Sequence, residues 1–277
     1  MTFFQLLKQA QQHLSPSSDA VIDAQYLACH VFQVSKQQLL AMLNEKIMSD
    51  TKEKHYQDLI QKRKQGIPLA YLLGHTSFLK KSYVIHPGVL IPRPETEELV
   101  LTIQKKIPTL PDFSYVWECG FGSGVICIEL ALFYKKSNVL AWDISRKAYK
   151  NANINARQYQ VSNLTLIPED FLKNTKPLMP TLFVANPPYI DRALYHTLSE
   201  EVKKEPKAAL FAGKKGMLMY EKICQFFHKR AWPKWLFFEI GFDLKQPLES
   251  LLSAYGLKDI SFLKDSQGLD RFLMIQS

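Results

Sequence analysis

The sequence lacks the cysteine patterns of metal sites and disulfide frameworks. Its four cysteines, among 277 residues, are scattered along the chain, and no two form a Cys-x-x-Cys pair. Structural zinc sites need closely spaced thiolate and imidazole ligands, and disulfide scaffolds need many cysteines in a short chain. We therefore predict no metal site and no disulfide, and we expect a reducing compartment, the cytoplasm.

Long apolar runs are missing as well. A membrane-spanning helix needs roughly 18 or more consecutive apolar residues, and no stretch comes close to that length. The N-terminal segment around Phe3, Phe4 and Lys8 is rich in glutamine and lacks the apolar core of a signal peptide. These absences predict a protein without membrane association.

Acidic residues are too few to balance the basic ones. The chain has 35 Lys and Arg against 26 Asp and Glu, which gives a formal net charge of +9. A positive charge favours acidic partners, but the lysines are spread along the chain and form no concentrated basic patch. We attribute the charge to a lysine-rich surface and predict no stable binding of nucleic acid.

Residues 1–75 show helical patterns and no obvious strand. Polar residues precede three apolar-periodic runs, as helix N-caps do: Ser18-Asp19, Ser35 and Ser49-Asp50. Residues 76–93 change character, because a short hairpin with a Lys80-Lys81-Ser82 turn is followed by two proline-rich turns. We predict a helical domain over 1–75 and a hairpin linker over 76–93.

Residues 94–277 alternate strand and helix. A helix is predicted from Pro94, where three glutamates fill the first turn, and two more at Val125–Phe133 and Lys147–Tyr159. Apolar strands are predicted at Tyr115–Cys119, Val139–Trp142, Leu164–Ile167, Leu182–Ala185 and Trp235–Ile240, with a final hairpin at Leu257–Leu263 and Arg271–Ile275. This alternation predicts an α/β fold with a mostly parallel, Rossmann-like sheet.

A glycine-rich turn follows the first of these strands. It reads Glu118-Cys119-Gly120-Phe121-Gly122-Ser123-Gly124, and Asp143 ends the next strand. Glycines let the backbone approach a ligand closely, and an acid roughly 20 residues further on suits a pair of ribose hydroxyls. The pattern predicts a nucleoside-containing ligand and by itself leaves a dinucleotide and S-adenosylmethionine open.

Two details favour S-adenosylmethionine. The glycine spacing is Gly-x-Gly-x-Gly, which differs from the Gly-x-Gly-x-x-Gly of a pyrophosphate site. The Glu118 carboxylate suits the ammonium of a methionine moiety and would repel a pyrophosphate. After the third strand, Asp170 and Phe171 are candidates for the adenine amine and ring, although Asp170 could equally cap a turn.

The most informative motif is Asn186-Pro187-Pro188-Tyr189, directly after the strand Leu182–Ala185. A proline-stiffened turn would explain the prolines but not the tyrosine. The functional interpretation starts from an amide nitrogen, whose lone pair is delocalised and poorly nucleophilic. The Asn186 oxygen and the Pro187 carbonyl could hold both N–H groups, while Tyr189 covers one face of the planar amide. Positioning of this kind can lower a barrier by roughly 7–11 kcal/mol.

These motifs, in this order, resemble the release-factor glutamine N5-methyltransferases nearly from end to end. Further matching segments are Ile67–Gly74, Val89–Glu98, Glu205-Pro206, Ala209-Leu210, Gly213 and Gly216. The resemblance implies a class I methyltransferase domain over 94–277 with S-adenosylmethionine on the glycine loop and ribose on Asp143. It also places Phe171 beside the adenine and Asn186, Tyr189 and Phe78 on the substrate side.

The family's substrate is the glutamine of a Gly-Gly-Gln tripeptide in class I peptide-chain release factors, and the helical domain would help to grip that partner. Pro94-Glu95-Thr96-Glu97 favours a release factor over the ribosomal-protein substrate of sister enzymes. Two residues depart from the family pattern. Glu118 replaces an aspartate, and Phe121 replaces a small residue, where it either points away from the cofactor or narrows its pocket.

Other classes of protein remain as alternatives. An N6-adenine DNA methyltransferase would use the same Asn186–Tyr189 motif on a flipped base, but the chain shows no sizeable insertion for target recognition. A non-enzymatic nucleotide-binding module would tolerate Asn186→Ala. A dinucleotide oxidoreductase would be separated by cofactor-binding calorimetry.

Overall fold

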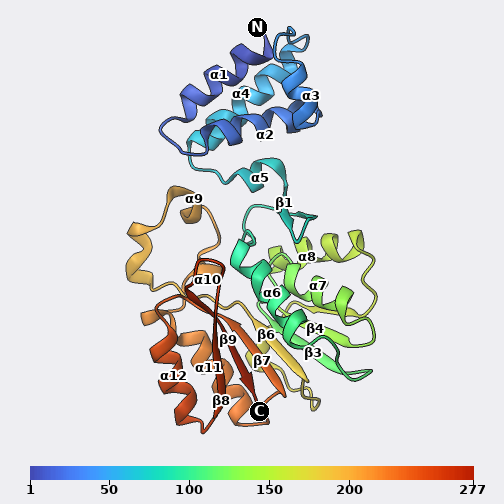
Figure 1. Ribbon diagram of the computed structural model, residues 1–277, viewed down its shortest axis with the longest axis vertical. Helices are drawn as coiled ribbons and strands as arrows, with labels where there is room; N and C mark the ends of the chain where they lie inside the picture. Colours follow the sequence, from blue (N-terminus) through green and yellow to red (C-terminus); the bar gives the residue numbers. More distant parts are fainter. The chain divides into compact units, whose positions relative to one another are not determined.

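The computed structural model describes residues 1–277, the side chain of Lys214 excepted, and divides into two compact units (Figure 1). The helical unit comprises Met1–His75 together with Ser199–Lys204. The sheet unit comprises Thr76–Leu198 and Glu205–Ser277. Among the described residues, no helix is long and apolar enough to cross a membrane.

The helical unit is built from five N-terminal helices and one short helix from later in the chain. These are α1 (Phe3–Leu14), α2 (Ala20–Phe32), α3 (Lys36–Ala41), α4 (Asp50–Lys64), α5 (Leu69–Leu73) and α9 (Glu200–Lys203). Ser35 and Ser49 cap α3 and α4 as predicted, each accepting a hydrogen bond from a backbone N–H of the first turn. Leucine, alanine and aromatic side chains of α1, α2 and α4 form the core of this unit.

The sheet unit begins with the hairpin β1 (His75–Phe78) and β2 (Lys81–Val84). Its turn lies at Leu79 and Lys80, both with positive φ, and not at Lys80–Ser82 as predicted. The first helices and strands that follow are α6 (Pro94–Lys106), β3 (Tyr115–Cys119), α7 (Val125–Phe133), β4 (Asn138–Trp142), α8 (Arg146–Gln158), β5 (Leu164–Ile167), η1 (Phe171–Lys173) and β6 (Leu182–Ala185).

The remaining elements of the sheet unit follow the Asn-Pro-Pro-Tyr motif. They are η2 (Arg192–Thr197), α10 (Lys207–Leu210), η3 (Lys214–Gly216), α11 (Leu218–His228), β7 (Trp235–Glu239), α12 (Lys245–Ala254), β8 (Asp259–Lys264) and β9 (Asp270–Gln276). Residues 190–217 therefore form short helices, whereas longer helices and strands resume at Leu218.

Seven strands form one sheet in the order β5-β4-β3-β6-β7-β9-β8. The first five in this order run parallel, and β9 pairs antiparallel with both β7 and β8. The predicted α/β fold with a mostly parallel sheet is confirmed. The sheet starts in the middle, at β3, and later strands are added on either side of it. The strand order therefore reverses at β3, and in open α/β sheets ligands bind where the order reverses.

Alternate residues of each strand face opposite layers of helices. Helices α6, α7 and α8 cover one face of the sheet, and α11 and α12 cover the other (Figure 1). Val116, Val184 and Phe237 pack with the first group, whereas Trp117, Phe183 and Phe238 pack with the second. Both layers are apolar, which explains why the central strands are apolar throughout. The period of two also fixes the direction of the residues at the strand ends: Glu118, Asn186 and Glu239 fall on the α6–α8 side.

The register of the sheet brings the predicted motifs to one edge. Cys119 of β3 pairs with Trp142 of β4 and with Ala185 of β6, and Ala185 pairs in turn with Phe238 of β7. The next residue of each strand therefore continues at the same carboxyl edge. Gly120, Asp143, Asn186 and Glu239 lie side by side there, although they are up to 119 positions apart in the chain.

Candidate active site

The glycine loop leaves room for a ligand. Gly120, Gly122 and Gly124 have φ values of 83°, 52° and 86°, a region that side chains rarely adopt. A Cβ added at Gly124 would lie 2.9 Å from the Cβ of Ala152, so this glycine permits the contact between α7 and α8. A Cβ added at Gly120 or Gly122 would meet nothing within 4 Å. The space over these two residues is open to a bound molecule.

Asp143 holds the loop from the neighbouring strand. Its Oδ2 accepts from the Gly122 N–H at 2.9 Å and its Oδ1 from the Ser145 N–H at 2.8 Å. Burial raises the pKa of this carboxyl, and the two backbone donors partly offset that shift. Each carboxylate oxygen has a second lone pair, so Asp143 can still accept from two adjacent hydroxyl groups.

Glu118 is the unusual residue of the site. It is 1% exposed, and its Oε2 is one of three buried side-chain atoms without a hydrogen-bond partner among the described residues. Burial raises the pKa of Glu118 to about 8, although contact with Cys127 acts in the opposite direction. An acceptor in this state is stabilised by an added cation, since burying a carboxylate without a partner is costly. The residue therefore fits the ammonium group of an amino-acid moiety.

Three phenylalanines predicted to touch ligands are core residues. Phe78 is fully buried beside Tyr83, with ring centroids 5.9 Å apart, so it has no surface for a substrate. Phe171 is 2% exposed and packs among tryptophan and phenylalanine rings under the sheet. Phe121 is 2% exposed and belongs to the core of the α6–α8 side. These predictions differ from the structure because a large aromatic ring gains more from burial than from lining an open cleft.

The structure shows which of the two orientations considered for Phe121 is adopted. The ring points into the core and does not narrow the space over the glycines. Ser123 beside it is also buried, and its carbonyl accepts from the Asn155 amide at 2.9 Å. Asp170 uses one carboxylate oxygen to cap the short helix η1, accepting from the Leu172 N–H at 3.0 Å.

Asn186 is half-buried at the end of β6 and is oriented by hydrogen bonds behind it. Its Nδ2 donates to Thr96 Oγ1 at 3.2 Å, and Thr96 Oγ1 donates to Glu239 Oε2 at 2.7 Å. Pro187 is buried, while Pro188 and Tyr189 are half-buried. Burial raises the pKa of Tyr189 to about 12, so its phenol stays protonated and uncharged.

Gly216 supports the backbone of the motif. Its φ is 69°, and a Cβ added there would lie 2.2 Å from the Tyr189 carbonyl oxygen, which is far inside van der Waals contact. The loop is further held by hydrogen bonds from the Ile190 N–H to the Leu210 carbonyl and from the Ala212 N–H to the Ile190 carbonyl. The backbone after Pro188 is thus fixed by the segment 210–216.

From the sequence, no role at the site was predicted for Thr96, Glu239 or Gly216. Glu239 is 1% exposed and lies beside Asn186. One signal could have identified it. Trp235–Glu239 is an apolar strand that ends in an acid, the strand Tyr115–Cys119 has an acid one residue before its end, and parallel strands end at one edge of the sheet. Thr96 and Gly216 were named only as parts of segments that match the family, because only the folded chain brings them to the motif.

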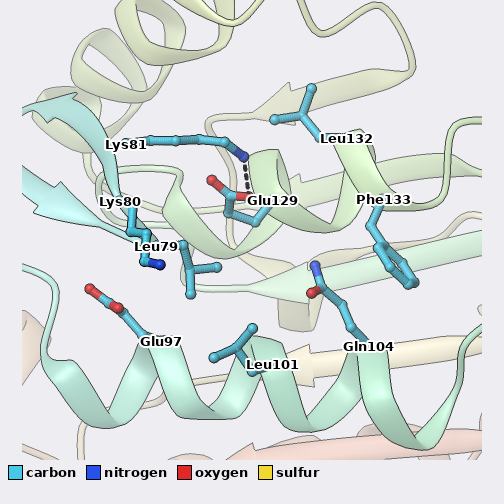
Figure 2. Close-up of a pocket in the computed structure, with 9 residues that line it drawn as sticks. All are labelled: Leu79, Lys80, Lys81, Glu97, Leu101, Gln104, Glu129, Leu132 and Phe133. Carbon is cyan, nitrogen blue, oxygen red and sulfur yellow. Dashed lines mark hydrogen bonds and ion pairs between the residues drawn. The ribbon is translucent and has the colours of Figure 1, made fainter.

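A groove of about 560 Å³ lies elsewhere in the sheet unit, between the hairpin turn, α6 and α7 (Figure 2). Leu79, Leu101 and Phe133 contribute its apolar surface, and Lys81 bonds Glu129 at 2.6 Å across one side. No residue of the carboxyl-edge site lines this groove. The groove is therefore separate from the residues gathered at the carboxyl edge.

The strand order, the open glycine loop and the acids at the carboxyl edge define a class I methyltransferase. A family model described as the methyltransferase small domain matches residues 96–220, and one described as the PrmC N-terminal domain matches residues 5–74. The solved catalytic domain of hMettl16 in complex with an RNA hairpin has the same fold, with a TM-score of 0.58, 13% identity and 82% of each chain covered.

Relatives over the full length identify the family. A release factor glutamine methyltransferase of Clostridium botulinum is 34% identical, covering 91% of this chain and 90% of that protein. One of Moorella thermoacetica is 32% identical, covering 98% of this chain and 97% of that protein. The chain belongs to the release factor glutamine methyltransferase family.

Proposed function

We propose that this protein transfers a methyl group from S-adenosylmethionine to the side-chain amide nitrogen of the glutamine in the Gly-Gly-Gln motif of class I release factors. The observation that carries the proposal is the orientation of Asn186 at the carboxyl edge. The Thr96 hydroxyl oxygen accepts a hydrogen bond from the Asn186 NH2 group. The Asn186 side-chain oxygen therefore lies on the opposite side, where it can accept from a substrate NH2 group.

The cofactor would lie along the glycine loop. Glu118 would meet the ammonium group of its methionine portion, Gly120 and Gly122 would provide space, and Asp143 would accept from the ribose hydroxyls. Asp170, at the end of the neighbouring strand β5, would face the adenine amine with the carboxylate oxygen that does not cap η1. When bound, S-adenosylmethionine supplies an electrophilic methyl group on a sulfonium centre.

The protein's own residues would make the amide nitrogen reactive by position. The Asn186 oxygen and the Pro187 carbonyl would accept its two N–H groups and direct the lone pair toward the methyl group. Tyr189, whose uncharged phenol is half-buried, would cover a face of the amide and exclude water. Fixed acceptors of this kind need little reorganisation during the reaction, which is a main source of enzymatic rate enhancement.

The helical unit, residues 1–75 with α9, would recognise the release factor, and the sheet unit would perform the transfer. A substrate of this kind places the enzyme in the cytoplasm. The Thr96 hydroxyl supports the choice of a release-factor enzyme, because the segment Pro94–Glu97 that favours this substrate in the sequence is also the segment that contacts Asn186.

The test is to incubate the protein with S-adenosylmethionine and a class I release factor and to map the methyl group by peptide mass spectrometry. We expect one added methyl group on the Gly-Gly-Gln glutamine. Asn186→Ala should abolish transfer and largely spare cofactor binding by calorimetry, whereas Asn138→Ala, at an exposed position, should behave like the wild type. Transfer to adenine in duplex DNA, with none to the release factor, would keep the chemistry and refute the substrate.

A further inference from the structure

Behind Asn186 lies a chain of two hydrogen bonds. Thr96 Oγ1, in the first turn of α6, is 3.2 Å from Asn186 Nδ2 and 2.7 Å from Glu239 Oε2. Thr96 is 3% exposed and Glu239 is 1% exposed, so neither side chain can reach a substrate. The hydrogen bond from Asn186 to Thr96 is the contact through which this pair can act on transfer.

The protons available to Thr96 and Glu239 determine which group donates in each of the two hydrogen bonds. The Thr96 hydroxyl has one proton, and an ionised Glu239 can only accept, so that proton goes to Glu239. The Thr96 oxygen is then available to Asn186 only as an acceptor. Asn186 must therefore present its NH2 group to Thr96, and its oxygen is directed to the opposite side.

We propose that Thr96 and Glu239 are positioning residues that set the orientation of the Asn186 amide, so that its oxygen faces the substrate amide. This inference rests on the proposed transfer to an amide nitrogen. The opposite orientation would place the Asn186 NH2 group against the substrate NH2 group, where two donors repel each other and the acceptor is lost.

Protonation of Glu239 would exchange donor and acceptor in both hydrogen bonds. A protonated Glu239 can donate to Thr96, whose hydroxyl is then able to donate to the Asn186 oxygen, and the amide can turn over. Burial raises the pKa of Glu239 to about 7, while the hydrogen bond from Thr96, the charge of Arg271 and the hydrogen bond from Asn186 lower it.

Other groups around Glu239 modify this equilibrium. Glu95, next to Thr96 on α6, raises the pKa of Glu239 by like charge. The phenols of Tyr189 and Tyr220 lie close enough to feel the Glu239 charge, and both have pKa values raised by burial, so they stay neutral. Of Asn186, Thr96 and Glu239, which these hydrogen bonds connect, Glu239 is therefore the residue that changes charge near neutral pH.

The kinetic experiment compares Thr96→Val, Thr96→Ser and Glu239→Gln with the wild type on a class I release factor. Valine keeps the shape of Thr96 but removes its hydroxyl, so kcat should fall about 10- to 100-fold, with a change in KM for the release factor below about 3-fold. Thr96→Ser restores the hydroxyl and should return kcat to within about 3-fold of the wild type. Thr102→Val, on the same helix, is the matched control and should change neither value.

The pH profile separates positioning from a merely structural role. The wild-type kcat should fall as the pH drops through about 7, because Glu239 gains its proton there. In Glu239→Gln this step should be absent, because glutamine has no carboxyl group to titrate. Wild-type kcat for Thr96→Val, with an unchanged pH step in Glu239→Gln, would overturn the inference.

A substrate-free measurement keeps this result distinct from the proposed function. The side-chain NH2 signals of Asn186, identified by their loss in Asn186→Ala, should shift with a midpoint near pH 7 in the wild type and stay constant in Glu239→Gln. If the wild type methylated no release factor, the proposed function would be wrong. The titration of the Asn186 signals would then test the orientation of Asn186 by itself. Signals that do not titrate in the wild type would refute it.

Discussion

The buried acids of the helical unit and those at the carboxyl edge of the sheet have different partners. In the helical unit, Arg63 lies between two acids, with its Nε 2.6 Å from Asp23 Oδ2 and its Nη2 2.5 Å from Glu201 Oε1. In the sheet unit, Glu118 has a buried oxygen without a partner among the described residues, and Glu239 bonds only neutral side chains there. Asp23 is thus stabilised by an ion pair, whereas neither Glu118 nor Glu239 forms an ion pair among the described residues.

The difference also shows in titration. Burial is the largest influence on the pKa of Asp23, but the hydrogen bond and charge of Arg63 oppose it. No cation opposes the burial of Glu118, and its pKa reaches about 8. A site that must accept a cationic ligand cannot contain its own cation, because an internal ion pair would have to break before binding.

Breaking the pair in the helical unit should have the largest effect on stability. Arg63→Ala leaves Asp23 buried and unpaired, so we expect a loss of about 3–5 kcal/mol in the free energy of unfolding, measured by urea denaturation. Lys62→Ala is the control, since Lys62 pairs with Asp58 on the exposed side of the same helix and should cost less than about 1 kcal/mol. Cofactor affinity in the sheet unit should not change.

Phe121→Thr should have the next largest effect. The variant restores the small residue of the family pattern in the cofactor loop, but it also empties a space in the core, so stability should fall by about 2–4 kcal/mol. Because the ring points away from the loop, cofactor affinity measured on the folded variant should stay within about 3-fold of the wild type. A large gain in affinity would show that Phe121 does narrow the cofactor site. Phe133→Thr, at an exposed phenylalanine, is the control for stability.

Asp143→Ala tests whether a buried acid at the sheet edge serves a ligand. Loss of the carboxylate removes the proposed ribose acceptors and one support of the loop, so the dissociation constant for S-adenosylmethionine should rise about 10- to 100-fold. Calorimetry provides the measurement. Asp170→Ala is the comparison, because that residue caps η1 and its loss should weaken binding less. Unchanged affinity in Asp143→Ala would show that the ribose assignment is wrong.

Glu118→Gln should have the smallest effect and the opposite sign. The folded pKa of about 8 lies above the ordinary value of 4.5, so the folded protein keeps a proton that the unfolded chain releases, and wild-type stability falls as the pH rises through this interval. Glutamine has no carboxyl group to titrate, so the variant does not lose stability in this way as the pH rises. At pH 8 the free variant should be more stable than the wild type, and at pH 4 the two should differ by almost nothing. The same variant should bind the cofactor more weakly, and tighter binding would contradict the role of Glu118.

The sequence predicts the strands more accurately than the surroundings of the site. Tyr115–Cys119, Leu164–Ile167 and Leu182–Ala185 have the predicted bounds, because continuous apolar runs between turn residues leave little choice. The short helices of residues 190–217 were not predicted, since each is too short to show a helical period in the sequence. The family resemblance placed Phe78 and Phe171 beside ligands and left two orientations open for Phe121, whereas tertiary packing puts all three in the core.

Gly216 has a consequence for how this protein tolerates mutation. A Cβ at this position would lie 2.2 Å from the Tyr189 carbonyl oxygen, and no side chain is short enough to avoid that collision. In a library of all substitutions scored by growth or by methyl transfer, position 216 should reject every alternative as firmly as position 186 does. A residue that has no side chain and never meets the substrate would then carry the genetic signature of a catalytic one.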